Sequence, residues 1–334
     1  MIRKVIMKKE TVMRTNRLGW TDLELTNIGL GTFPMGGGDW EAGWGPQDDK
    51  ESISSIRHAI ELGINWIDTA PAYGLGKAET LVHKAIGKMS NPPIIATKCG
   101  LTWSPDRKLL NVMKKESVKK EAEDSLKRLN VDVIDLYQIH WPIPDEDIEE
   151  AWTAIAQLIE EGKVKYGGVC NCSVAQMERL AKIHPIASLQ SPYSMIIRDI
   201  EKGELKYCRK HRIGVIPYSP MQRGLLTGKY NRDTVEQLAP NDHRRNEPYF
   251  QQPEFGVNLK LIEGLRPLAE EEDRVLAQLA LAWVLRRSEV TAAIVGARRP
   301  SQLDDTVLAG DWDLDKKKIR AIDRLLKSRD RELG

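Results

Sequence analysis

The chain has 334 residues, 41% of them hydrophobic, which is enough to bury the core of two ordinary domains or of one large α/β barrel. The net charge is only +2 with 29% charged residues, so the chain is not a strongly basic protein. Its composition gives no reason to expect a nucleic-acid or membrane-surface partner. No apolar run approaches the length of a membrane span. Four cysteines without a CxxC pair indicate reduced thiols in a cytoplasmic protein.

The first residues are basic, but they lack a sustained apolar stretch and a cleavage site, so they do not resemble a secretory signal. We expect residues 1–13 to be an N-terminal extension and residues 14–334 to form a single domain. Residues 14–28 are predicted to form a β-hairpin, with its turn at 18–22.

A short strand is predicted at residues 28–33, and it contains the pattern Gly29-x-Gly31. A dinucleotide-binding fingerprint would require a tight turn and a helix directly after the strand. Here Pro34 and a loop rich in glycine and tryptophan follow instead, up to residue 46. We therefore reject the fingerprint.

From residue 48 the chain alternates amphipathic helices with short, nearly continuous Ile/Val/Leu strands, as in a parallel sheet covered on both faces. Eight such units predict a (β/α)₈ TIM barrel, with an additional C-terminal helix at residues 316–327. An open doubly wound sheet is the alternative, disfavoured because no glycine-rich strand–turn–helix motif occurs. The predicted strands are 28–33, 64–67, 94–97, 133–139, 164–169, 186–189, 213–217 and 291–295. The predicted helices are 48–62, 77–88, 114–129, 147–161, 173–183, 200–211, 257–269, 274–287, 300–309 and 316–327.

The active site of such a barrel lies at the C-terminal ends of the strands. Most residues at those positions are polar or aromatic, whereas inert turns are usually built from Gly, Pro, Ser and Asp. The residues are Gly31, Thr32, Asp68, Lys98, His140, Asn171, Gln190, Tyr218 and Gly296.

Four of the polar side chains suit proton transfer to a carbonyl oxygen. Tyr73, on the loop after Asp68, is the general acid, and a lysine ammonium beside it lowers the pKa of its phenol. Asp68 holds Lys98 charged and oriented, and His140 positions the carbonyl. Because the chain shows no nucleophile motif and no metal-ligand motif, the reaction needs an external hydride, which indicates a nicotinamide cofactor.

The second half of the chain offers a seat for that cofactor. Asn171 and Gln190 can hold a carboxamide, and Tyr218 can stack on a flat ring. Arg223, with Gly224 and the backbone near Ser219, suits a pyrophosphate. Arg298 and Arg299 precede a helix N-terminus and could bind an extra phosphate, which favours NADP over NAD.

These blocks resemble the aldo-keto reductase superfamily over about residues 14–310. Asp68, Tyr73, Lys98 and His140 match its catalytic tetrad in order and spacing, and the segments 216–220, 223–228 and 295–300 are similar to its cofactor-binding blocks. The resemblance implies a (β/α)₈ barrel that uses NADPH, with NAD as the alternative cofactor, and no metal. The cofactor-binding residues it implies are Gly31, Thr32, Asp68, Cys170, Asn171, Gln190, Tyr218, Ser219, Pro220, Met221, Arg223, Gly224, Leu225, Gly296, Arg298, Gln302, Asp305 and Thr306.

The chain also departs from the family pattern. Cys170 stands where a serine is common, and a thiol is a weaker hydrogen-bond donor than a hydroxyl. Asp305 and Thr306 replace a frequent Glu-Asn pair, and Gly296 and Ala297 occupy a stretch where some members carry a phosphate-binding lysine. The NADP preference then depends on Arg298 and Gln302.

A small-molecule carbonyl compound is the expected substrate. Its pocket is predicted to be lined by aromatic and proton-transfer residues: Phe33, Trp44, Tyr73, Trp103, His140 and Trp141. Loops 34–46, 101–113 and 222–255 would set its specificity. The alternative function is a cofactor-binding regulatory or sensory subunit resembling the potassium-channel β-subunits of the same superfamily.

Overall fold

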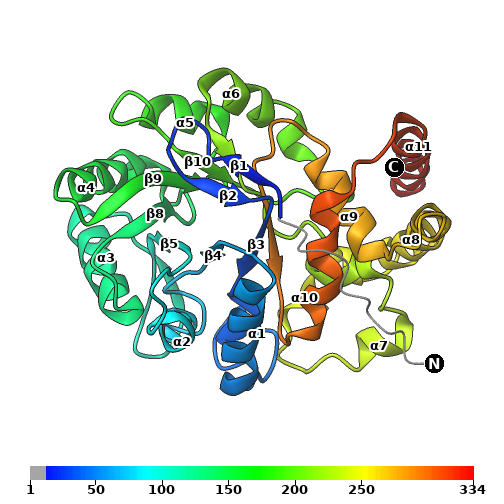
Figure 1. The fold of residues 1–334 in the computed structure, drawn as a ribbon, viewed down its shortest axis with the longest axis horizontal. Coiled ribbons are helices and arrows are strands. Elements are labelled where there is room, and N and C mark those ends of the chain that lie inside the picture. The colour runs from blue at the N-terminus through cyan, green and yellow to red at the C-terminus, as the bar shows by residue number, and fades with distance from the viewer. Residues whose placement is uncertain (1–12) are drawn as a thin grey trace.

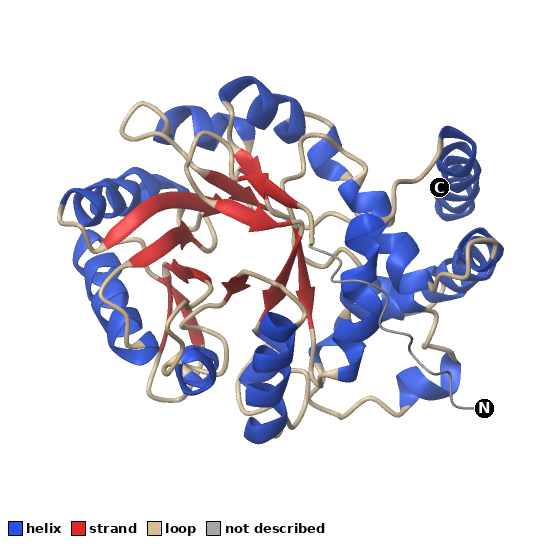
Figure 2. Cartoon of the chain, viewed as in Figure 1, coloured by secondary structure: helices blue, strands red, loops and turns tan. Residues whose placement is uncertain are grey.

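A computed structural model describes residues 13–334, and within it eight parallel strands form one sheet surrounded by helices (Figures 1 and 2). The order across the sheet is β11-β10-β9-β8-β5-β4-β3-β12. The two outer strands are joined where Thr291 N donates to Val215 O at 2.8 Å and Ile294 N donates to Pro217 O at 2.9 Å. The predicted (β/α)₈ barrel is therefore confirmed. Its strands are β3 (Ile28–Gly31), β4 (Trp66–Asp68), β5 (Ile94–Cys99), β8 (Ile134–Ile139), β9 (Val164–Cys170), β10 (Ser188–Gln190), β11 (Gly214–Val215) and β12 (Ala293–Gly296).

Every predicted helix has a counterpart in the structure, and each buries apolar side chains against the sheet or against neighbouring helices. In α4, for example, Ala151, Ile155 and Leu158 are fully buried. The helices are α1 (Asp49–Glu61), α2 (Lys77–Ile86), α3 (Lys115–Leu129), α4 (Ile148–Glu160), α5 (Val174–Leu180), α6 (Glu204–His211), α7 (Arg232–Glu236), α8 (Glu254–Glu270), α9 (Leu276–Leu285), α10 (Ser301–Thr306) and α11 (Lys316–Leu333).

Most helix bounds lie within four residues of the prediction, and two helices differ more. The short α7 lies in the segment expected to be irregular. The C-terminal α11 runs to Leu333 rather than ending at residue 327, and it packs beside α8 on the outside of the barrel (Figure 1). In its last turns Arg329 donates hydrogen bonds to Asn258 and Glu254 of α8. No local sequence pattern predicts this contact.

The predicted hairpin consists of β1 (Thr15–Arg17) and β2 (Glu24–Thr26), paired antiparallel. Its turn inserts Leu18, which is fully buried, into the barrel end at which the strands begin. Gly214 leaves room for this side chain, since a Cβ there would lie 2.3 Å from Leu18 Cδ1. The hairpin thus plugs the end of the barrel opposite the predicted active site. The predicted N-terminal extension, residues 1–13, lies outside the described residues apart from Met13.

A second hairpin was not predicted. It consists of β6 (Leu101–Trp103) and β7 (Leu109–Asn111) and follows β5 at the C-terminal end of the barrel. No helix within residues 13–334 is both long and apolar enough to cross a lipid bilayer.

Candidate active site

Asp68 and Lys98 form a buried ion pair inside the barrel mouth. Lys98 Nζ donates to Asp68 Oδ1 at 2.8 Å, to Asp68 Oδ2 at 2.7 Å and to the backbone oxygen of Thr69 at 2.9 Å. The register explains the meeting: Asp68 on β4 lies opposite Ala96 on β5, and Lys98 follows two residues later on the same face. The lysine side chain is fully buried, so its charge depends on this carboxylate.

Tyr73 and His140 complete the predicted group of four. The Lys98 ammonium lies 5.0 Å from the centroid of the Tyr73 ring, and the Tyr73 and His140 rings lie 5.7 Å apart, edge to face. His140 N donates to Cys99 O at 2.9 Å, which extends the pairing of β8 with β5 and places the imidazole at the mouth. The four side chains therefore meet, as predicted.

The loop after Tyr73 is tightly shaped. Gly74, Leu75 and Gly76 all have positive φ angles, of 65°, 56° and 93°. At Gly74 a Cβ would lie 2.3 Å from Gly36 O, so only glycine permits this close approach. The contact holds the tyrosine against the loop that follows β3.

Burial sets the protonation states of the group. It raises the pKa of the Tyr73 phenol above the ordinary value, and the opposing effect of Lys98 does not cancel that rise. The Lys98 ammonium lowers the pKa of Tyr73 as expected, but desolvation has the larger effect, so the net shift is upward. Burial lowers the pKa of Lys98, but attraction to Asp68 and Tyr73 outweighs burial and raises it. Burial and Lys98 keep the pKa of His140 well below its usual range. Tyr73 and His140 are accordingly neutral at physiological pH.

Gln190 and Asn171 lie at the mouth, but both make contacts within the protein. Gln190 Nε2 donates to Asp68 Oδ1 at 2.7 Å, which adds the glutamine to the ion-pair network. Asn171 Nδ2 donates to His140 O at 3.0 Å and its Oδ1 accepts from Tyr218 Oη at 3.0 Å. The second bond joins two of the predicted cofactor residues.

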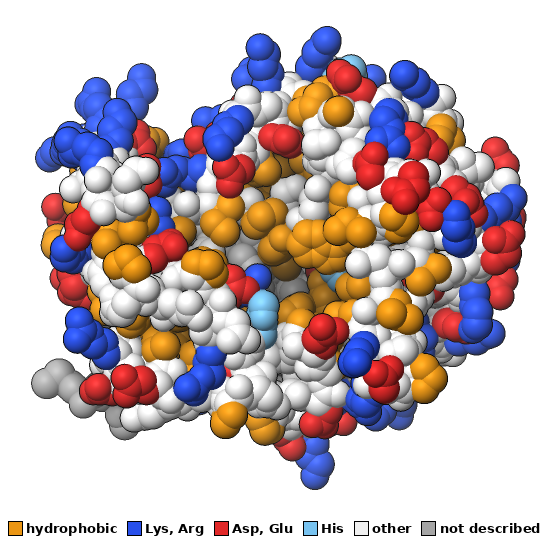
Figure 3. All heavy atoms as spheres, turned by 180° about the vertical axis from the view of Figure 1, so that it is seen from behind, with side chains coloured by type: hydrophobic (Ala, Val, Ile, Leu, Met, Phe, Trp, Pro, Cys, Tyr) orange, Lys and Arg blue, Asp and Glu red, His pale blue; other side chains and the backbone are white. Residues whose placement is uncertain are grey.

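The residues predicted to line the substrate pocket include several aromatic side chains that contact one another. Phe33 packs edge to face with Tyr73 at 5.0 Å and with Trp44 at 5.5 Å between ring centroids. Trp141 stacks on His140 and is partly exposed. Trp103 lies on β6. Seen from the side opposite to Figure 1, the molecule is hollowed near its centre, with hydrophobic side chains around the hollow (Figure 3).

The segment after Tyr218 has an unusual backbone. Ser219, Gln222 and Arg223 adopt positive φ angles of 53°, 48° and 53°, followed by Gly224 at 91°. Arg223 was predicted to bind pyrophosphate, but its guanidinium forms an ion pair with Glu247. In the structure its charge is therefore already compensated.

Arg298 is also engaged. Its Nε donates to Gln47 Oε1 at 2.7 Å, and its two terminal nitrogens donate to the backbone oxygens of Trp44 and Pro46. Gln302 Oε1 accepts from the backbone nitrogen of Arg298 at 2.8 Å. The arginine thus ties the start of α10 to the loop after β3, and a phosphate would have to replace some of these acceptors.

The remaining predicted cofactor residues lie around the same rim or beneath it. Thr32 is buried and bonds to Thr69, and Thr306 is buried and bonds to the backbone of its own helix. Burial raises the pKa of the Cys170 thiol, which stays protonated. Gly31 and Gly296 end β3 and β12, Asp305 is exposed on α10, and Leu225 is buried in the core beside the segment that holds Pro220 and Met221.

Lys229, which the sequence analysis passed over, lies at this rim near three arginines. Burial together with Arg244, Arg299 and Arg298 lowers the pKa of Lys229 to about 8. A Cβ at Gly224 would lie 3.3 Å from Lys229 Nζ, so the ammonium lies against the left-handed segment. Among the described residues Lys229 has no carboxylate within ion-pair distance, and its side chain is exposed, so an anionic ligand can reach the ammonium.

Comparison with known proteins agrees with this geometry. Residues 27–327 match the model of the aldo/keto reductase family. The chain is 36% identical to an aldo-keto reductase of Bacillus subtilis, with 92% of each chain covered, and 34% identical to the NADH-specific methylglyoxal reductase of Escherichia coli, with 89% and 93% covered. Among solved structures it resembles a glycerol dehydrogenase from Gluconobacter oxydans, with a TM-score of 0.86, 37% identity and 94% and 95% of the chains covered.

The chain belongs to the aldo/keto reductase family. It is therefore an NAD(P)H-dependent oxidoreductase that acts on carbonyl groups. As an aldo/keto reductase it uses a nicotinamide cofactor, and the residues at the mouth fit one: among the described residues the Lys229 ammonium lies over the Tyr230 ring but pairs with no carboxylate, beside the left-handed backbone of Gln222–Gly224. Within residues 13–334 no cluster of His, Cys, Asp and Glu side chains is arranged as a metal site.

Two functional candidates of this aldo/keto reductase were missed from its sequence. Lys229 directly follows Gly228, a turn glycine with a φ of 73°, at the end of the segment 223–228 that the sequence analysis did single out. Trp40 is buried against Phe33 and Tyr73, and only its place in the Trp-rich loop pointed to it.

Proposed function

We propose that this enzyme reduces aldehydes or ketones to alcohols, with Tyr73 as the general acid and NADPH as the preferred cofactor. The observation that carries the proposal is the meeting of Tyr73 with Lys98, Asp68 and His140 at the mouth of the barrel. A neutral phenol is the form that can donate a proton.

The roles follow from charge and position. The nicotinamide, when bound, supplies the hydride that the carbonyl carbon receives. Tyr73 gives its proton to the carbonyl oxygen, and the Lys98 ammonium stabilises the phenolate that remains. Asp68 keeps the lysine charged and aimed at the tyrosine. A neutral His140 offers a hydrogen bond that orients the carbonyl without competing for the proton.

The NADP preference is supported by the four cations at the cofactor end of the mouth. Lys229, Arg244, Arg298 and Arg299 lie close enough for the three arginines to lower the pKa of the lysine. Arg244 is paired with Asp242, which leaves Lys229, Arg298 and Arg299 to compensate the additional phosphate of NADPH. The relative from Escherichia coli is named as NADH-specific, so the preference needs its own measurement.

The direct experiment is a titration with NADPH and with NADH, followed by quenching of tryptophan fluorescence, and then turnover with a simple aldehyde. We expect tighter binding of NADPH and steady consumption of it. Equal affinities would overturn the NADP preference alone. Binding without any turnover over a panel of aldehydes and ketones would favour the alternative of a cofactor-sensing subunit. The proposal also includes a cytoplasmic location.

A further inference from the structure

The cofactor segment Gln222–Gly224 holds a backbone conformation that its sequence does not favour. Three consecutive residues have positive φ angles, and two of them are not glycine. Such a conformation persists only where the surrounding structure enforces it. The groups that enforce it are therefore relevant to cofactor binding, and two chains of contacts lead from this segment to the end of α11.

The first chain of contacts begins at Arg329, which is buried although it lies five residues from the end of the sequence. Its Nε donates to Asn258 Oδ1 and its Nη2 to Glu254 Oε1, both at 2.6 Å and both on α8. Asn258 in turn donates from Nδ2 to Tyr249 O at 3.1 Å. The ring of Tyr249 faces the guanidinium of Arg223, 6.0 Å from its centroid.

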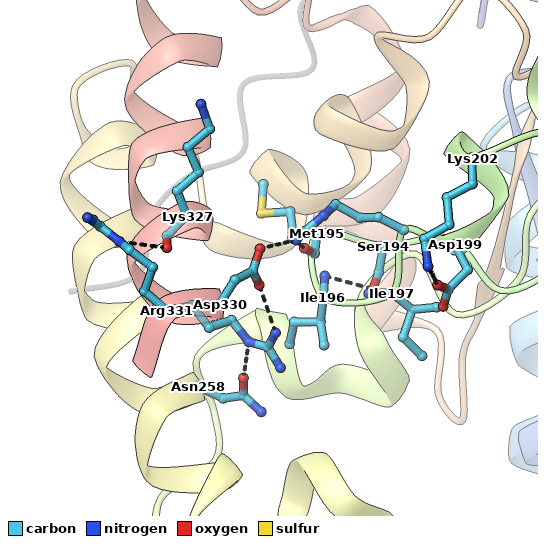
Figure 4. Close-up of polar contacts among 12 residues, drawn as sticks. Ser194, Met195, Ile196, Ile197, Asp199, Lys202, Asn258, Lys327, Asp330 and Arg331 are labelled. Carbon is cyan, nitrogen blue, oxygen red and sulfur yellow. Dashed lines mark hydrogen bonds and ion pairs between the residues drawn. The ribbon is translucent and has the colours of Figure 1, made fainter. Parts of the chain in front are cut away.

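The second chain of contacts begins at the neighbouring Asp330. Its carboxylate accepts from Arg198 Nη2 at 2.5 Å, and Arg198 also donates to Met195 O. The ion pair attaches the loop that follows β10 to α11. Figure 4 shows Asp330 between this loop and Asn258 of α8.

Ser194 carries the second connection to the cofactor segment. Its Oγ accepts from the backbone nitrogens of Ile196 at 3.1 Å and Ile197 at 3.0 Å, which shapes the loop. The same hydroxyl donates to Gln222 Oε1 at 2.6 Å, in a fully enclosed position. Gln222 is the first of the three left-handed residues, so the loop held by Asp330 also holds that segment.

We propose that Arg329 and Asp330 are positioning residues that, through these two chains of contacts, hold Gln222–Gly224 in the conformation that binds the cofactor. The inference rests on the proposed cofactor seat. The family model matches residues up to 327, so both residues lie just beyond that match. Neither residue touches the reacting groups, and their effect is confined to cofactor affinity.

The test compares Arg329→Ala and Asp330→Asn with the control Arg331→Ala, whose Nε donates only to Lys327 O on the same exposed helix surface. NADPH affinity is measured by fluorescence titration, kcat at saturating NADPH, and stability by thermal unfolding. We expect both variants to raise the Kd for NADPH about fivefold or more while kcat at saturation changes by less than about twofold, and the control to match the wild type. Arg329→Lys, which can reach only one acceptor on α8, should give an intermediate Kd.

A Kd unchanged in both variants would overturn the inference, as would an equal loss in the Arg331→Ala control. A kcat that falls together with affinity would also contradict it, because a positioning role acts through binding alone. If Arg329→Ala does not fold, Asp330→Asn alone tests the inference. The Asp330 side chain is 43% exposed and asparagine has the same shape, so this variant should fold. Failure of the wild type to bind NADPH would instead overturn the proposed cofactor, and with it this inference.

Discussion

Gln190 Nε2 donates a 2.7 Å hydrogen bond to Asp68 Oδ1, across the barrel interior from β10 to β4. Asp68 thus accepts from two side chains, Lys98 and Gln190, rather than from the lysine alone. The glutamine, predicted as a carboxamide ligand, joins the cofactor side of the mouth to the proton-transfer group.

Replacing Gln190 with methionine should slow hydride transfer about tenfold, because a hydrogen bond to a buried charge contributes roughly 1.5–3 kcal/mol. The measurement is single-turnover reduction of an aldehyde at saturating NADPH. Gln138→Met is the matched control. Gln138 is also buried, but its side-chain oxygen makes only long hydrogen bonds, of 3.4 Å, with Ser188 and Gln190, and none with Asp68. Equal rates in the two variants would remove the role assigned to the bond.

Lys98→Met should cost about 3–5 kcal/mol of unfolding free energy, because it leaves the buried Asp68 carboxylate without its cation. Adding Asp68→Leu should restore most of that stability, since an apolar pair can replace a buried ion pair. Activity should stay lost in both variants. Denaturant unfolding and turnover measured side by side check this, and recovery of turnover in the double variant would contradict the role of the pair.

Glu121 predicts a dependence of stability on pH. It is buried behind β5, where it accepts from Gly100 N at 3.0 Å and Ser117 Oγ at 3.2 Å, and burial raises its pKa to about 7. The folded protein therefore binds this proton more tightly than the unfolded chain, whose carboxyl titrates near 4.5. The resulting stabilisation is complete below pH 4.5 and is lost as pH rises through 7.

Glu121→Gln should remove this pH dependence. In the wild type it amounts to about 3 kcal/mol, from a pKa shift of roughly 2.5 units. Unfolding free energies between pH 5 and 8 measure it, with the exposed Glu116→Gln on the same helix as control. A wild type and a Glu121→Gln variant with parallel pH profiles would disprove the assignment.

The sequence predicted the parts of the site that follow strand ends. Asp68, Lys98 and His140 each close an apolar run, and parallel strands bring such residues to one end of a barrel. The contacts of Arg298 and Arg223 could not be predicted, because their partners, Gln47 and Glu247, lie on loops without periodicity.

The same limit applies to the β6–β7 hairpin. Its segments of three residues each are too short to show alternation, and its β7 strand is largely exposed, so only the fold reveals it. The turn at Gly228 marks the position of Lys229 in the sequence. The lowering of its pKa, however, depends on Arg244, Arg298 and Arg299, which only the fold brings close to it.

Lys229 also predicts a pH dependence of cofactor affinity. Its pKa is lowered to about 8, and an anion beside the ammonium raises the pKa again. The ammonium of the free enzyme is lost above pH 8, so the Kd for NADPH should rise from there. Lys229→Met should weaken binding below pH 8 and flatten that rise. Titrations from pH 6 to 9.5 test this, and an unchanged pH profile in the variant would exclude Lys229 from the seat.

The central claim is that Tyr73 donates the proton. The most direct measurement is single-turnover reduction of an aldehyde by Tyr73→Phe, which keeps the ring packed against Phe33 and removes only the hydroxyl. We predict unchanged NADPH binding and a rate of hydride transfer that falls by about 10²–10⁴-fold, the usual contribution of a general acid. A rate equal to that of the wild type would contradict the account.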